Sequence, residues 1–190
     1  MNIHSILLRS AGVLTLLFSL PSLHSQALYA CRDGYVYWIS DAPLELIEAE
    51  SDNLQGVIKE ADRTFAFSLS IRSFDGFNNG LQQEHFHENY LETEEYSKAL
   101  FSGKILDAVD FSQPGIQTVR AKGMLEVHGI RQERIIKTTL NIKADGSMTI
   151  SSDFTIILAD HDIRIPRIVF QKIAEEIRVR VRATLNTDTP

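Results

Sequence analysis

The side chains of this sequence that could carry chemistry are few, and most of them are histidines. Beyond residue 27 there are four: His85, His87, His128 and His161. Imidazole and carboxylate groups bind metals and move protons near neutral pH. His85 and His87 lie two residues apart in a predicted helix, where they point in different directions, so we do not expect them to share a metal ion. Glu88 lies nearer the face of His85, but a hydrated polar helix surface explains that pair better.

A hydrolase or metal enzyme using His85, Glu88 or His161 is the least favoured of three functional hypotheses. His161 lies in an acidic loop, and His128 precedes a glycine at the end of a strand. The sequence has no serine nucleophile elbow, no CxxC or HExxH motif and no glycine-rich phosphate loop. We therefore predict no catalytic residue, no metal site and no cofactor.

The first 27 residues have the features of a secretion signal. Arg9 provides a positive start, Ala11–Leu20 is an apolar run, and Ser25–Ala27 offers small residues for cleavage. A retained membrane anchor is the alternative, but the run is shorter than the roughly 20 residues that span a bilayer. We expect cleavage of residues 1–27, a single domain over residues 28–190, and a periplasmic or secreted protein.

Cys31 is the single cysteine, so the monomer has no internal disulfide. The sequence Leu28–Cys31 partly resembles the lipobox of bacterial lipoproteins, but Tyr29 is large for that motif. An unpaired cysteine near the mature N-terminus is the favoured interpretation.

The net charge excludes some partners. It is −6 for the whole chain, and removal of Arg9 with the signal brings it to −7. An acidic protein has no overall electrostatic attraction to nucleic acid or to an anionic membrane. We therefore expect no nucleic acid as a partner. The short apolar run argues against an integral membrane span, and a homodimer is left open.

One predicted helix stands among many predicted strands. Residues 81–91 contain no glycine or proline, and Phe86 and Tyr90 share one helical face. The predicted strands cover residues 35–40, 46–49, 54–59, 64–72, 99–107, 119–128, 130–142, 148–159 and 175–185. A short helical turn is expected at residues 168–174. A lone helix in an antiparallel β protein usually plugs an open end of the sheet or covers its apolar face. The pattern predicts an up-and-down barrel or a sandwich, and we interpret the helix as the stopper of a barrel.

Alternation assigns the faces of several strands. In the last strand Val179 and Val181 alternate with Arg178, Arg180 and Arg182, and because the arginines must be hydrated, the valines face inward. Large inward residues are mixed with small ones, which indicates either an apolar cavity or a filled, tapering barrel. The predicted lining residues, with the helix included, are Phe67, Leu69, Ile71, Phe86, Tyr90, Phe101, Gly103, Ala121, Gly123, Leu125, Phe154, Ile156, Val179 and Val181.

Five segments together resemble the YceI-like family, the lipid- or polyisoprenoid-binding proteins of bacterial periplasms. The resemblance covers residues 34–185 and rests on the order and spacing of the segments. They are residues 34–44 (GYVYWISDAPL), 67–74 (FSLSIRSF), 83–104 around QEHFHENYL and FSGK, 123–130 (GMLEVHGI) and 154–166 around FTIILAD. His87, Ser97 and the pair at 161–162 depart from the family pattern.

The resemblance implies a mainly β fold, an antiparallel lipocalin-like β-barrel of about eight strands. The residue pattern adds one α-helix that plugs the barrel and a short helical turn before the last strand. The resemblance also implies an apolar tunnel for a polyisoprenoid or another long-chain lipid, and, because the sequence has no enzyme motif, we expect no catalysis. The alternative is a filled-barrel envelope or stress protein that acts through protein contacts.

Overall fold

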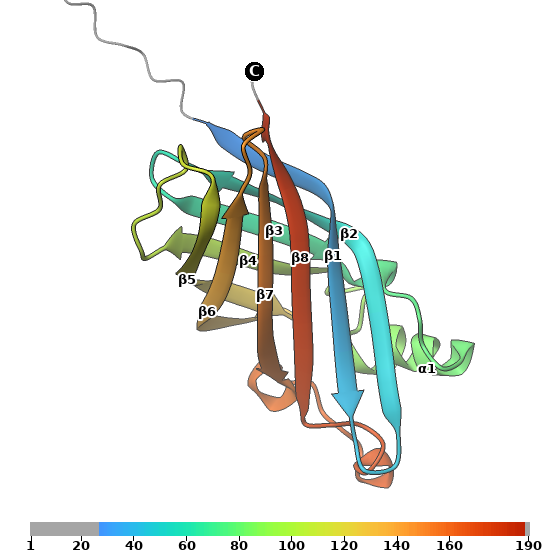
Figure 1. Ribbon diagram of the computed structural model, residues 1–190. Helices are drawn as coiled ribbons and strands as arrows, with labels where there is room; N and C mark the ends of the chain where they lie inside the picture. Colours follow the sequence, from blue (N-terminus) through green and yellow to red (C-terminus); the bar gives the residue numbers. More distant parts are fainter. Residues whose placement is uncertain (1–26, 189–190) are drawn as a thin grey trace, which may run out of the picture.

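Eight antiparallel strands follow one another around a closed barrel, and β8 pairs with β1 to complete it (Figure 1). The structure is a computed structural model that describes residues 27–188. All of the predicted signal peptide except Ala27 therefore lies outside the described residues. The strands are β1 (Leu28–Asp41), β2 (Leu46–Lys59), β3 (Thr64–Ser70), β4 (Lys98–Ile105), β5 (Gly115–Val127), β6 (Ile130–Ile142), β7 (Met148–Ile157) and β8 (Glu176–Asp188). The predicted eight-stranded barrel is confirmed.

Helix α1 (Gly80–His85) continues directly into a wider π-helical turn (Phe86–Tyr90), so the predicted helix exists with a change of pitch in its middle. The Asn79 side chain caps its start by accepting a hydrogen bond from the Gln82 N–H at 2.9 Å. Short 3-10 turns stand at Ile71–Ser73, Leu158–His161 and Arg167–Val169. The last of these shares only Ile168 and Val169 with the helical turn predicted at residues 168–174, so the turn begins one residue earlier and is shorter than expected.

Several predicted strand ends are wrong, and β2 shows why. We predicted two short strands at 46–49 and 54–59, but β2 is continuous over 14 residues. Ser51 faces inward between the two halves, buried, with its hydroxyl 2.6 Å from the hydroxyl of Ser73. The buried serine interrupts the apolar alternation without breaking the strand, because another hydroxyl satisfies it. Just after it, the register with β1 shifts, and the inward position moves from Ser51 to Leu54, which changes the parity of the second half.

The opposite error occurs in β3. This strand ends at Ser70, and Ile71 begins a 3-10 turn although it continues the alternation of Phe65, Phe67 and Leu69. Ile71 is buried all the same, with 3% of its surface exposed. The apolar period therefore predicted its burial correctly and its backbone incorrectly.

The two ends of the barrel differ in how they are filled. At the end near the chain termini, Tyr29 stacks on Phe111 with ring centroids 5.5 Å apart. Met148 and Leu185 are paired there and fully buried. The other end carries the β1–β2 turn, the helix and the long β7–β8 connection (Figure 1). The helix therefore covers the end opposite the packed one.

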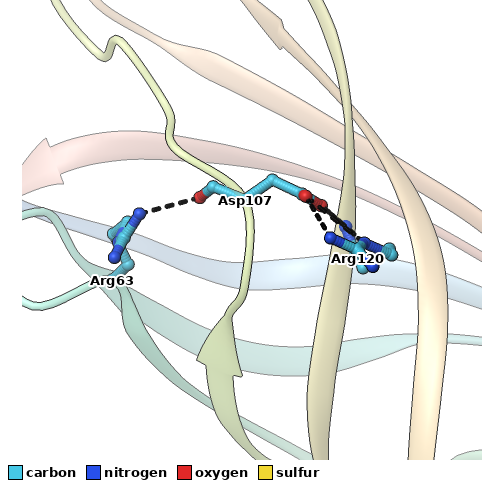
Figure 2. Close-up of polar contacts among 3 residues, drawn as sticks. All are labelled: Arg63, Asp107 and Arg120. Carbon is cyan, nitrogen blue, oxygen red and sulfur yellow. Dashed lines mark hydrogen bonds and ion pairs between the residues drawn. The ribbon is translucent and has the colours of Figure 1, made fainter.

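A polar cluster anchors the loop after β4 at the packed end. Figure 2 shows Asp107 between two arginines. Arg63 donates to its backbone carbonyl at 3.0 Å, and Arg120 donates to its carboxylate at 2.7 Å. The hydrogen bonds from Arg120 hold the pKa of the Asp107 carboxyl below its ordinary value. This cluster ties the β2–β3 turn to the start of the β4–β5 connection.

Candidate functional site

The barrel encloses a cavity of about 510 Å³ to which all eight strands and the helix contribute side chains. Its volume is in the usual range of ligand pockets, about 300–1,000 Å³. The residues that seal the packed end, Tyr29, Phe111, Met148 and Leu185, are not among its lining residues. The interior is thus filled near the termini and hollow beneath the helix.

The cavity brings together most of the residues predicted to line it. Strand period alone placed ten of these on the inward face, and the helical period placed Phe86 and Tyr90 there as well. The twelve that line the cavity are Phe67, Leu69, Ile71, Phe86, Tyr90, Phe101, Ala121, Leu125, Phe154, Ile156, Val179 and Val181.

Gly103 and Gly123 do not line the cavity. They pair directly across β4 and β5. A Cβ on Gly103 would collide with the Lys122 carbonyl oxygen, and one on Gly123 would collide with the Ser102 carbonyl oxygen. Both glycines therefore allow the two backbones to approach closely, which is the role of glycine at crowded positions in sheets.

Sequence reasoning missed an aromatic cluster that joins the helix to the barrel wall. Trp38 of β1 stacks on Phe86 with ring centroids 5.4 Å apart, and Phe77 lies 5.0 Å from Phe86. Phe74 meets both Trp38 and Phe86 edge-on, at 6.1 and 6.0 Å. All four residues line the cavity. Trp38 could have been found from the sequence, because it lies two residues after Val36 and so on the same inward face of the strand. Phe74 and Phe77 could not, because they lie in a loop without periodicity.

The cavity has a mouth where its lining residues reach solvent. Leu81 of the helix lines it and is 60% exposed. Glu45 from the β1–β2 turn accepts a hydrogen bond from the Gln82 side chain at 2.9 Å, and its second oxygen lies 3.9 Å from the Lys172 ammonium. Glu45 thus bridges the helix and the β7–β8 connection across this opening.

The interior is almost free of charge. Apart from Tyr90, the ionisable lining residues are Glu45, His85 and Lys172, and all three stand at the mouth. Burial raises the pKa of Tyr90, so its hydroxyl stays neutral. Deeper inside, Thr138 and Ser152 face each other across β6 and β7 with their hydroxyls 2.8 Å apart. A charged group placed there would have no partner, so the cavity suits an uncharged, mainly apolar ligand.

The histidines considered for catalysis do not converge. His128 has both ring nitrogens occupied, by the His161 carbonyl at 3.0 Å and by the Glu92 carboxylate at 2.8 Å. His161 is fully buried, with Nδ1 3.1 Å from the Ile130 carbonyl. Neither residue lines the cavity. The Glu92–His128 pair spans 36 residues and has no signal in the sequence.

Within residues 27–188, no group of three or more histidine, cysteine, aspartate or glutamate side chains is placed to bind a metal ion. In that same part of the chain, no helix has the length and apolarity needed to cross a membrane.

Cys31 is a buried core residue. Its side chain is 5% exposed, its thiol lies 3.6 Å from the Leu54 carbonyl oxygen, and burial is the main cause that raises its pKa. A protonated, buried thiol is a poor nucleophile. In this fold Cys31 packs as a small apolar side chain.

A closed eight-stranded barrel around an apolar cavity is the architecture of small-ligand-binding β-barrels. The family model of the YceI-like domain matches residues 45–185, so the chain belongs to the YceI-like family. The resemblance found from the sequence is thereby confirmed. No curated protein matches the sequence significantly.

Solved structures support the same fold. A polyisoprenoid-binding domain from Saccharophagus degradans, implicated in plant cell wall breakdown, superposes with a TM-score of 0.70 at 13% identity, over 86% of this chain and 99% of its own. BcnA of Burkholderia cenocepacia gives 0.66 at 14% identity, over 80% and 95%. A YCEI protein of Campylobacter jejuni gives 0.51 at 11% identity, over 96% and 100%.

Proposed function

We propose that this chain is a non-enzymatic binding protein that holds the long apolar chain of a lipid, a polyisoprenoid or an acyl lipid, inside the barrel. The observation that carries the proposal is the 510 Å³ cavity, whose ionisable groups other than Tyr90 stand at the mouth. Burying hydrocarbon in such a space contributes about 0.8 kcal/mol per CH₂ group. The family and the polyisoprenoid-binding domain among the structural neighbours support the same ligand class.

A filled barrel that acts only through protein contacts fits one half of the molecule. The packed end around Met148 and Leu185 has the interior expected of a scaffold. The half beneath the helix does not have such an interior. An empty apolar cavity lowers the stability of the fold, and a protein that acts only through its outer surface gains nothing from it. The hollow half favours binding over the scaffold.

We also propose that the protein is secreted or periplasmic, with its mature N-terminus at Leu28. Cleavage after Ala27 would leave β1 whole. Cleavage before Cys31, as in a lipoprotein, would remove residues 28–30, which pair with both β2 and β8. It would also require acylation of a buried thiol. N-terminal sequencing that begins at a lipid-modified Cys31 would contradict this proposal.

Solvent extraction of the purified protein, followed by mass spectrometry, tests the binding function. Ala121→Phe places a large side chain in the cavity and should lower the co-purified lipid severalfold while the protein stays folded. Ala66→Phe, on the exposed outer face of β3, is the matched control and should retain the lipid. Wild-type protein without lipid, together with an Ala121→Phe variant destabilised by about 1–3 kcal/mol through overpacking, would support the scaffold instead.

A further inference from the structure

Large apolar side chains are exposed around the mouth of the cavity. They come from the β1–β2 region, the helix and the β7–β8 connection. We call them the apolar rim: Leu44 (67% exposed), Leu46 (48%), Leu81 (60%), Ile168 (92%) and Phe170 (63%). Single exposed apolar residues are ordinary, but a group at one opening marks an interaction surface.

Polar contacts hold the three segments of the rim together. The Leu44 N–H donates to the Gln171 carbonyl at 2.9 Å, which joins the β1–β2 turn to the β7–β8 connection. The Asn78 side chain donates to the Leu46 carbonyl at 2.9 Å, which joins the start of the helix to β2. Figure 1 shows the turn and the connection at the same end of the barrel. The rim is therefore one surface.

The β7–β8 connection has apolar side chains on both of its sides. Val169 and Ile173 line the cavity, whereas Ile168 and Phe170 point to solvent. Leu81 belongs to both sets, because it lines the cavity and is mostly exposed. Apolar side chains thus occur on the inner side of the mouth and on its outer tips.

The basic side chains of this connection are concentrated in its central part. The connection as a whole (residues 158–175) is balanced, with Asp160, Asp162 and Glu175 near its ends. The central residues 163–174, which carry the tips of the rim, contain Arg164, Arg167 and Lys172 and no acidic residue. Arg164 pairs with Asp162 at 3.2 Å, and Lys172 lies 3.9 Å from Glu45. Arg167 is exposed and forms no ion pair with residues 27–187. A positive charge therefore stands directly beside Ile168, the most exposed side chain of the rim, and three residues before Phe170.

We propose that the apolar rim docks on the surface of a phospholipid bilayer. Exposed aliphatic and aromatic tips flanked by basic side chains are what enters the boundary between headgroups and acyl chains. Ile168 and Phe170 insert, and the Arg167 guanidinium meets lipid phosphate. This orientation turns the cavity mouth toward the acyl chains, which a protein partner would not need. Net charge argued against an anionic membrane, but attraction decays within a Debye length, so the local charge of the docking segment dominates.

Vesicle flotation tests the docking. Vesicles of phosphatidylethanolamine and phosphatidylglycerol should carry wild-type protein upward in a density gradient. Ile168→Ser combined with Phe170→Ser should weaken binding at least about tenfold, because each tip loses part of its transfer free energy. Ile116→Ser is the matched control: Ile116 is 72% exposed but lies near the start of β5, at the packed end. It should bind like wild type, and all variants should keep the wild-type melting temperature.

The contribution of charge is tested separately. Arg167→Gln should weaken binding to these vesicles about fivefold, as expected for one basic residue near an anionic surface. It should change binding to pure phosphatidylcholine vesicles less. Wild-type protein that stays at the bottom of the gradient, or a rim variant that floats like wild type, would overturn the proposal.

The docking goes beyond the proposed function and can fail independently of it. Protein that retains co-purified lipid but does not bind vesicles would overturn the docking alone. Protein that binds vesicles through the rim but never contains lipid would overturn the cavity ligand alone.

Discussion

Trp38 and Phe86 stack with ring centroids 5.4 Å apart and planes inclined by 21°. They lie far apart in the sequence, one on β1 and the other in the π-helical turn. This contact, with Phe74 and Phe77 packed around it, attaches the helix to the barrel wall. The cover of the cavity therefore rests on aromatic packing.

Phe86→Ala should loosen this cover. Phe86 is half-buried, so we expect a loss of about 2 kcal/mol, less than the 3–5 kcal/mol of a fully buried phenylalanine. Glu84→Ala, on the exposed side of the helix, is the control and should change stability by less than about 0.5 kcal/mol. Urea denaturation measures both. Equal effects of the two substitutions would show that the aromatic cluster does not anchor the helix.

Gly123→Ala should destabilise the barrel although it adds only a methyl group. The new Cβ would meet the Ser102 carbonyl oxygen and lie 3.0 Å from the Phe101 ring. Because two backbones must separate, we expect a loss of about 1–3 kcal/mol. Gly80→Ala has nothing within 4 Å of its Cβ and should be neutral or slightly stabilising. A normal melting temperature for Gly123→Ala would show that the strands are less tightly apposed.

The faces of β8 can be tested by adding the same charge to each. Val181→Asp would place a carboxylate on the cavity wall without a partner and should cost more than about 3 kcal/mol. Thr184→Asp adds that charge to the exposed face and should be tolerated. Replacing Arg178, Arg180 or Arg182 by Gln should change stability by no more than about 0.5 kcal/mol. Thermal melts in the reverse order would invert the assignment of the faces.

Stability should fall as the pH drops below 6.5, partly through His161. Burial is the main cause that lowers the pKa of His161 from 6.5, and the Ile130 and Val127 carbonyls partly oppose it. Below pH 6.5 the unfolded chain therefore binds a proton that the folded chain resists, which favours unfolding. Burial also lowers the pKa of His87, which adds to the effect.

His161→Gln should reduce this pH dependence, whatever it does to stability at neutral pH. His85→Gln is the control, because His85 is exposed. Denaturation midpoints measured from neutral pH downward give the slope for each protein. An unchanged slope in His161→Gln would show that His161 is protonated equally in both states.

The sequence by itself determined which residues face inward along the strands. In β3 and β8 the side chains alternate strictly, since successive residues of a strand point to opposite faces, and one face is apolar. The same rule predicted a barrel or a sandwich and most of the cavity lining, and the resemblance to the YceI-like family favoured the barrel. The rule failed in the middle of β2, where the polar Ser51 and a shift of register interrupt the apolar alternation, and at the end of β3, where Ile71 continues the alternation although it begins a 3-10 turn.

Only the tertiary structure decided how the interior is divided. Whether inward side chains fill a barrel depends on the volume that the strands enclose and on where the strand ends meet. Neither can be predicted from the pattern of neighbouring residues in the sequence. Met148 and Leu185 pack one end, whereas Ala121 and Val181, on strands of the same character, border a void.

The two glycines and the aromatic cluster could not be predicted from the sequence for the same reason. Gly103 and Gly123 had the parity of lining residues, but only the pairing of β4 with β5 shows that their backbones need the room. Phe74 and Phe77 lie in a loop without periodicity, and the fold alone brings them against Trp38. Alternation is a local property of the chain, whereas register, loop placement and enclosed volume arise only when distant segments meet.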